Sequence, residues 1–327
     1  MNCSQPMKYS RIRKSCAKGF TLAELMVAMS ITLVLTLLTL LITGTAIDTW
    51  KAARSEIRAA GQAKVMLNAL GRDLESMVSR LGNNDSQWLL ATTPPEGVGP
   101  EGQKSPNAAR LVFFTSASDR YNGNAGSRER LGNASGGNRN ADLGGDISAV
   151  SYELDFLDPV FGNPNPRFST FVLYRNLLDP KETYDRSMLG SQNLETAFDA
   201  SAGKNELEDL MCENVFEFTV TFVIDYRDTA GLDRTTKITV MSSNNAGGPR
   251  TVKNFAVNGT GLAPNLNTRS EFVGGRITSV ELAITVLSDE GVATLKKNPF
   301  GGNVNANNRF IEQNSYRYTR SVTIPQG

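Results

Sequence analysis

The chain has 327 residues, 40% of them hydrophobic, which is enough for a sizeable core in one large or two modest domains. Its net charge is +1, but residues 1–19 carry five basic and no acidic side chains, while the rest carries 29 basic and 33 acidic ones. A slightly acidic body gives no reason to expect nucleic-acid binding. A chain without histidine also lacks the commonest general base and metal ligand.

An apolar segment, residues 20–47, follows the basic one. Glu24 is its only charged residue, and it is long enough to cross a bilayer as a helix. Because the basic flank precedes it, residues 1–19 are expected in the cytoplasm and the body across the membrane. A secretory signal peptide would have a shorter apolar region followed by a small-residue cleavage site. An ordinary membrane anchor leaves Glu24 unexplained, because a carboxylate inside an apolar helix is costly and usually paired.

The residues from Lys18 to Met29, KGFTLAELMVAM, resemble the N-terminal signature of type IV prepilins and pseudopilins. The resemblance joins a basic leader, a glycine, a phenylalanine, a glutamate at fixed spacing and an uninterrupted apolar helix. It implies that a prepilin peptidase cuts between Gly19 and Phe20 and methylates the new N-terminus on Phe20. Glu24 would then be the fifth mature residue, where this family places its glutamate. The nineteen-residue leader is longer than the shortest leaders of the family.

The chemistry of the cleaved end favours a role for Glu24 in assembly. Cleavage leaves a cationic amine on Phe20, and this amine and the Glu24 carboxylate are both costly in hydrocarbon. Pairing them, within one subunit or between neighbours, lowers that cost. Between subunits, the pair would also set the axial register, so we expect Glu24 to be the assembly residue.

Helical signals continue through residues 48–82, which contain no proline. The apolar residues of this segment have the spacing of one helix face: Leu67, Leu70, Leu74, Met77, Val78 and Leu81. The Gly-Asn-Asn sequence that begins at Gly82 is a helix stop signal. The sequence therefore predicts a helix from Phe20 to Leu81, with a transmembrane part at 20–47 and an amphipathic part at 48–82 that packs on a sheet.

The remaining residues, 83–327, predict a globular β-rich body. Seven runs have the composition of strands: Arg110–Thr115, Ile147–Phe156, Phe168–Arg175, Val215–Val223, Thr235–Met241, Arg276–Leu287 and Tyr316–Ile324. Their alternation suits antiparallel strands with one face on a core. Segments rich in Gly, Asn, Ser and Pro, at 116–146, 242–275 and 297–315, are expected to be surface loops. The predicted fold class is α+β, a long N-terminal helix packed on an antiparallel β-sheet body with long loops.

The order of segments is similar to that of the J-type minor pseudopilins of type II secretion and the W-type minor pilins. The supporting pieces are GRDLESMVSRL, ARLVFFTSAS, LMCENVFEFTVTFVIDY, GRITSVELAITVLSDE and YRYTRSVTIPQG. The chain is longer than expected in this comparison, and residues 121–146 look like an insertion. The resemblance implies a structural subunit of a type II secretion pseudopilus or type IV pilus-like filament. The missing histidines and the absence of complete catalytic motifs weigh against an enzyme, and no cofactor is expected.

The resemblance also implies partners and a location. The partners are the prepilin peptidase, other pilin or pseudopilin subunits, the inner-membrane assembly platform and membrane lipid. The location is the inner membrane, crossed once with a cytoplasmic N-terminus and a periplasmic body, and then the filament. Two alternatives stay open: a membrane-tethered binding or adhesion module at a filament tip, and a subunit of a different filament encoded by a dedicated gene cassette.

Other motifs favour structural interpretations. Gly97–Gly102 matches G-x-G-x-x-G, but neighbouring prolines predict a loop rather than a dinucleotide site. Ser201–Lys204 matches S-x-x-K without its partner motifs. Cys212, the one cysteine left after cleavage, is expected to be a buried apolar residue. Trp50 is a candidate interfacial anchor, with packing against the body as the alternative.

Calcium is a weaker possibility, because Ca²⁺ takes six to eight oxygen ligands. Asn303, Asn305 and Asn307 have alternating spacing but are neutral, and Asp142 and Asp146 are a second option. Solvated loops are the preferred interpretation for both groups, so no metal site is assigned.

Overall fold

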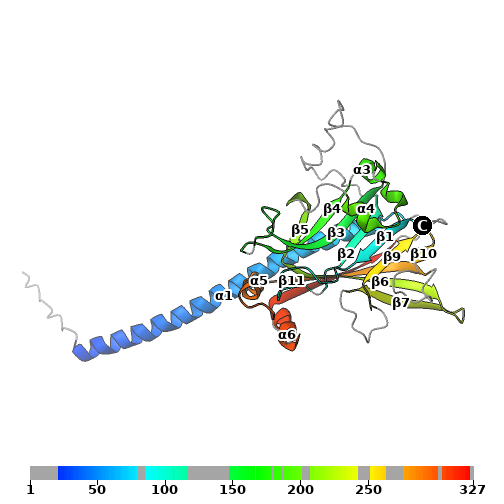
Figure 1. Cartoon of the computed structure of the whole chain (residues 1–327). Helices are drawn as coiled ribbons and strands as arrows, with labels where there is room; N and C mark the ends of the chain where they lie inside the picture. Colours follow the sequence, from blue (N-terminus) through cyan, green and yellow to red (C-terminus); the bar gives the residue numbers. More distant parts are fainter. Residues whose placement is uncertain are drawn as a thin grey trace, which may run out of the picture. The chain divides into compact units, whose positions relative to one another are not determined.

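The computed structural model describes residues 21–79, 85–105, 107–116, 147–165, 167–178, 180–185, 187–200, 207–241, 251–262, 275–300 and 304–324. The chain divides between Ala53 and Arg54 into two compact units, called here the anchor unit and the body unit. The body unit contains antiparallel sheets and short helices (Figure 1). The α+β class predicted from the sequence is confirmed, with two sheets in place of one.

Helix α1 runs from Leu22 to Glu75, so it ends six residues before the predicted Leu81. Tertiary pairing ends it, because Met77 forms a bridge with Thr115 of the neighbouring strand. The Val78 N–H then donates to the Phe114 carbonyl oxygen at 2.9 Å, which takes the backbone out of helical geometry. The predicted apolar face is confirmed where the structure describes it, since Leu67, Leu70, Leu74 and Met77 are buried and Val78 is partly so.

Two sheets form the body unit. The first has the strand order β10-β9-β1-β2-β3-β4-β5, and all its neighbours are antiparallel. The second has the order β12-β11-β6-β7-β8 and is antiparallel except for the β7–β8 pair. The strands are β1 (Gln87–Thr92), β2 (Arg110–Thr115), β3 (Ser148–Leu157), β4 (Thr170–Leu177), β5 (Leu210–Glu213), β6 (Val215–Arg227), β7 (Asp233–Val240), β8 (Thr251–Val252), β9 (Asn254–Asn258), β10 (Gly261–Leu262), β11 (Arg276–Leu287) and β12 (Ser315–Thr323).

All seven predicted strands are present, and β2 and β11 have the predicted bounds. One expected loop is wrong in part, because residues 242–275 contain β8, β9 and β10. Strand β9 lies between β10 and β1 and buries Phe255, Ala256 and Val257, so long-range pairing rather than local composition makes it a strand.

Short helices connect the strands: α3 (Pro180–Asp185), α4 (Leu194–Asp199), α5 (Asp289–Lys297), α6 (Val304–Asn314) and the 3₁₀ turns η1 (Met188–Gly190) and η2 (Leu207–Asp209). Helix α5 is capped by Ser288, whose hydroxyl accepts from the Gly291 N–H at 3.0 Å. Helix α6 corrects the expectation of a loop at 297–315, since it buries part of Phe310 and Ile311 against the core.

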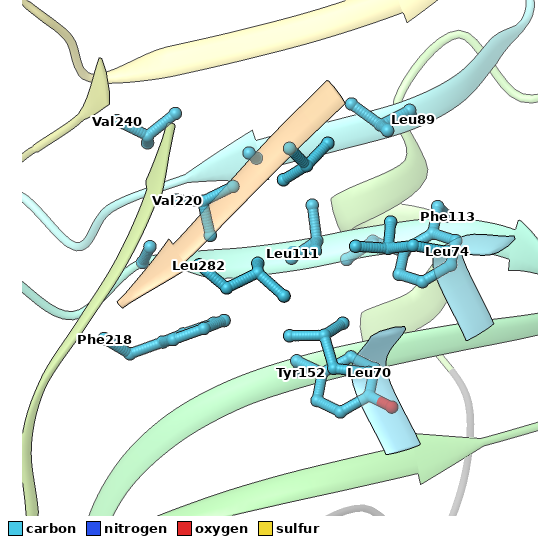
Figure 2. Packing of buried hydrophobic residues seen from close by; sticks show 14 of the residues in the cluster. Leu70, Leu74, Leu89, Leu111, Phe113, Tyr152, Phe218, Val220, Val240 and Leu282 are labelled. Carbon is cyan, nitrogen blue, oxygen red and sulfur yellow. The ribbon is translucent and has the colours of Figure 1, made fainter. Parts of the chain in front are cut away.

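The core of the body unit is shared by both sheets and by the body-unit part of α1. Figure 2 shows Leu70 and Leu74 of α1 among Leu111, Phe113 and Tyr152 of the first sheet. Phe218, Val220 and Leu282 of the second sheet face the same cluster. The predicted packing of the amphipathic helix on a sheet is therefore confirmed.

A buried ion pair fixes the end of α1 to the first sheet. Asp73 and Arg175 are 3% and 4% exposed, and the Arg175 guanidinium donates to both Asp73 carboxylate oxygens at 2.8 and 2.9 Å. The Tyr152 hydroxyl donates to Asp73 Oδ2 at 2.6 Å, and Tyr152 lies opposite Arg175 in the β3–β4 ladder. Burial and the Asp73 charge raise the pKa of Tyr152, so its hydroxyl keeps the proton that it donates.

Candidate processing and assembly segment

The structure begins at Thr21, so the predicted cleavage residues Gly19 and Phe20 lie outside the described residues. Glu24 is described, in the first turn of α1. The predicted grouping of the Phe20 amine and the Glu24 carboxylate therefore stays a prediction.

Thr21 and Glu24 form a reciprocal cap at the start of α1. The Thr21 N–H and hydroxyl donate to Glu24 Oε2 at 2.9 and 3.0 Å, and the Glu24 N–H donates to Thr21 Oγ1 at 3.3 Å. This is a capping box, in which a threonine and a glutamate three residues later satisfy each other's backbone N–H groups. The T-x-x-E spacing before an apolar run is a known sign of this cap, so the sequence contained the signal although the role was not predicted.

The cap leaves half of the Glu24 carboxylate available. Both hydrogen bonds that Thr21 donates go to Glu24 Oε2. None of the described residues donates a hydrogen bond to Glu24 Oε1. The carboxylate is thus oriented by its own helix while one oxygen stays open. A carboxylate held in this way can accept a proton donor from outside the helix without losing its cap.

The anchor-unit part of α1 has the surface of a membrane span. Among the described residues, α1 is the one helix long and apolar enough to cross a bilayer. Its side chains from Leu22 to Ile47 are exposed in the isolated chain. A shallow apolar groove follows one face, lined by Leu25, Ala28, Met29, Thr32, Leu33, Thr36 and Leu37.

The hydroxyl groups of this segment are satisfied within the helix. Thr32, Thr36, Thr39 and Thr43 each donate to the carbonyl oxygen four residues earlier at 2.8 Å, and Ser30 does the same. Polar groups in hydrocarbon need such internal partners, because the bilayer core contains no water to replace them. A run rich in threonine is therefore compatible with a membrane span.

The remaining candidate motifs have structural explanations or lie outside the described residues. Gly97, Gly99 and Gly102 adopt positive φ in the turns between β1 and β2, with no helix after them, so the predicted loop is confirmed. Ser201–Lys204 lies outside the described residues. Trp50 lies in α1 with a 63% exposed side chain, and its interfacial role stays a prediction.

The calcium candidates receive no support. Asn303, Asp142 and Asp146 lie outside the described residues, while Asn305 and Asn307 belong to α6 and not to a solvated loop. Within the part of the chain that the structure describes, no three His, Cys, Asp or Glu side chains are grouped to hold a metal ion.

Cys212 is fully buried in β5, as predicted. Burial, together with the nearby Glu213 carboxylate, raises the pKa of its thiol to about 12, from an ordinary value near 9. We therefore expect the mature chain, in which Cys212 is the one cysteine, to resist maleimide at pH 8 and to react fully in denaturant. Rapid labelling of the folded chain, followed by mass spectrometry, would contradict this burial.

The same pKa shift makes the folding stability depend on pH. The folded state holds the Cys212 proton more tightly than the unfolded state, so its contribution to stability is complete below about pH 9 and is lost as the pH rises toward 12. In urea titrations between pH 8 and 11, the free energy of unfolding of a Cys212→Ala variant is expected to lack the part of its decrease with pH that comes from this thiol.

Comparison with known proteins gives one motif match. Residues 14–40 match the family model of the prokaryotic N-terminal methylation motif. The chain therefore carries a prepilin-type N-terminal segment, and this segment spans both the predicted cut and the Thr21–Glu24 cap. No similar sequence was found among the curated proteins.

One solved structure is similar in part, a type IV-like pilin from Thermus thermophilus. It is 9% identical, and the match covers 82% of this chain and 96% of the pilin with a TM-score of 0.29. At that TM-score the two backbones agree too little to indicate a shared function.

Proposed function

We propose that the chain is a pilin-like structural subunit, not an enzyme, that a prepilin peptidase cleaves between Gly19 and Phe20. The observation that carries this proposal is the methylation motif at residues 14–40, followed directly by a capped helix with an exposed apolar surface. The peptidase methylates the Phe20 amine, and the mature N-terminus enters a filament with other pilin or pseudopilin subunits.

The architecture supports a minor subunit of a type II secretion pseudopilus or type IV pilus-like filament. Before assembly, α1 anchors the chain in the inner membrane, with residues 1–19 in the cytoplasm and the body in the periplasm. The inner-membrane platform then moves the subunit out of the lipid. The large two-sheet body favours a position near the tip, where its bulk does not interrupt a shaft.

Glu24 acts in this proposal through its open oxygen. Oε2 stays with the Thr21 cap, while Oε1 accepts from the methylated amine of Phe20 on a neighbouring subunit. Pairing removes the cost of two isolated charges in the apolar interior of the filament.

Mass spectrometry of the mature N-terminus tests the processing step. In cells that contain a prepilin peptidase, the chain is expected to begin with N-methylated Phe20. The matched control is Gly19→Val, which places a branched side chain at the cut and should keep the leader attached. An intact leader on the unmodified chain, in the presence of an active peptidase, would refute the proposal.

A further inference from the structure

Three apolar side chains are exposed together on the turn between β3 and β4, residues 158–169. Val160, Phe161 and Phe168 are 67%, 73% and 54% exposed. Beyond α1, the other large apolar side chains that are exposed among the described residues are Tyr184, Leu207 and Leu232, which lie apart in the sequence. Three of these six side chains therefore lie on one turn, which makes the turn a candidate interaction site.

The turn is held in shape by its own hydrogen bonds. Asp158 Oδ1 accepts from the Val160 and Phe161 N–H groups at 2.9 and 3.4 Å. The Asp158 carbonyl oxygen accepts from the Gly162 N–H at 2.8 Å, and the Asn165 N–H donates to the Ser169 hydroxyl at 2.7 Å. Because these bonds fix the backbone, the Val160 and Phe161 side chains are presented outward before any partner arrives, which lowers the entropy lost on binding.

Cationic groups lie on the Phe168 side of the turn. The Arg167 guanidinium lies 5.3 Å from the Phe168 ring centre. Lys296, at the end of α5, donates to the Arg167 carbonyl oxygen at 3.4 Å, and the next residue, Lys297, is exposed. The acid of the turn, Asp158, is only 2% exposed, its Oδ1 accepts from the backbone, and its charge acts on Lys296. The outer surface of the turn is therefore apolar with a basic margin.

The turn lies at the end of the body unit where the body-unit part of α1 begins. Asp73 binds Arg175 of β4, while Arg58, one of the earliest body-unit residues of α1, binds Glu213 of β5. Glu213 pairs with Val172, which is nearer the turn than Arg175 is. Within the body unit, the direction along β4 toward the turn is thus the direction along α1 from Asp73 toward Arg58.

The covalent tether limits how far this end can be from a membrane. Six residues lie between Ile47, the last of the apolar segment, and Arg54, the first of the body unit, so the two are seven steps apart along the chain. Even fully extended, seven steps span at most about 25 Å. The end of the body unit near Arg54 therefore stays within about 25 Å of the bilayer, whatever the angle between the units.

We propose that the β3–β4 turn is a second membrane contact, in which Val160, Phe161 and Phe168 enter the headgroup region of an anionic bilayer. Arg167, Lys296 and Lys297 bind the lipid phosphates around them. Exposed aromatic and aliphatic side chains insert into the headgroup region of a bilayer, and neighbouring basic side chains bind anionic lipid. The contact orients the body unit against the membrane before assembly and must be released when the subunit leaves the lipid. This inference rests on the membrane anchoring in the proposed function.

Quenching by brominated lipid tests the contact in the full-length chain. The chain is reconstituted in phosphatidylcholine vesicles, with and without phosphatidylglycerol, and all carry brominated acyl chains. Phe161→Trp is introduced with Trp50→Phe, which leaves Trp88, buried in β1, as a constant background. The matched control is Tyr184→Trp on α3, since Tyr184 is 74% exposed and follows the opposite end of β4.

We expect strong quenching of the Phe161→Trp chain in the anionic vesicles and little quenching of the Tyr184→Trp chain. Adding Lys297→Gln to Phe161→Trp should lower the ratio of bound to free turn about fivefold, as expected for one basic residue near an anionic surface. Equal quenching of the two tryptophan variants would overturn the proposal. So would a Phe161→Trp signal that follows the protein density in the vesicles, because that would indicate contact with a second copy.

Extraction with alkaline carbonate separates this proposal from the anchoring itself. A chain that stays in the vesicles while Phe161→Trp is unquenched would refute the turn contact and leave the anchor intact. Release of the unmodified chain would refute the anchor, and with it both proposals.

Discussion

Replacing Asp73 with alanine is expected to destabilise the body unit by about 3–5 kcal/mol, because the buried Arg175 guanidinium then loses both of its hydrogen bonds to the Asp73 carboxylate. Arg175 is 4% exposed, so water cannot replace the lost carboxylate without opening the contact between α1 and the first sheet. The Tyr152 hydroxyl loses its acceptor in the same step. Urea unfolding of the detergent-solubilised chain measures the loss, with Trp88 as the fluorophore and Trp50→Phe as the background.

The matched control for Asp73→Ala is Glu75→Ala, one turn of the chain away. Glu75 pairs with Arg320 at 3.3 Å, but its side chain is 55% exposed, so its removal should cost under about 1 kcal/mol. Removing Arg175 as well, as Arg175→Met in the Asp73→Ala chain, should recover part of the stability, because the buried guanidinium that lost its carboxylate is then replaced by an apolar side chain. Equal losses for Asp73→Ala and Glu75→Ala would show that the buried pair is not the fixing contact.

Glu24→Gln is expected to abolish filament assembly while leaving cleavage intact. Glutamine can still cap the Thr21 N–H, so the helix start is preserved and only the charge is lost. The Phe20 amine of the neighbour then lacks a counter-charge in an apolar interior, at a cost of about 3 kcal/mol. This corresponds to about a hundredfold fall in incorporation. Sheared-filament fractions measure assembly, and mass spectrometry of the N-terminus measures cleavage.

Thr21→Ala separates the cap from the charge. It removes the threonine contacts at a cost of about 1 kcal/mol but keeps the Glu24 carboxylate, so assembly should fall far less than with Glu24→Gln. If Glu24→Gln gives normal filaments while Thr21→Ala does not, the role of Glu24 is to cap the helix and not to neutralise an amine.

The features that were predictable from the sequence depend on local pattern. Strand β11 has the predicted bounds because alternation along RITSVELAITVL follows one buried face. The early end of α1 at Glu75 was not predictable, because it depends on Met77 pairing with Thr115 across the fold. Likewise, β9 consists of five residues in a segment rich in Gly and Asn, and its neighbours β1 and β10 make it a strand.

In the candidate site, too, the predictable features depend on local pattern and the others on long-range contacts. Gly19, Phe20 and Glu24 come from a fixed local spacing, and so does the overlooked Thr21–Glu24 cap. The Asp73–Arg175 pair joins residues 102 apart in the chain, and no local pattern distinguishes it from solvated charges. The β3–β4 turn is similar, because its composition is that of an ordinary loop and only the structure shows which apolar side chains stay outside the core.

Two ion pairs between α1 and the first sheet differ in how they would bear mechanical load. Tension transmitted along α1 from its N-terminal end first meets Arg58 and Glu213, whose side chains are 52% and 26% exposed and readily exchange with water. The tension reaches the buried Asp73–Arg175 pair only after the turns of α1 between Arg58 and Asp73 have detached from the sheet. The intervening turns carry Met66, Leu67 and Leu70 of the core. The helix therefore yields in stages, with the exposed ion pair first, the core turns next and the buried ion pair last.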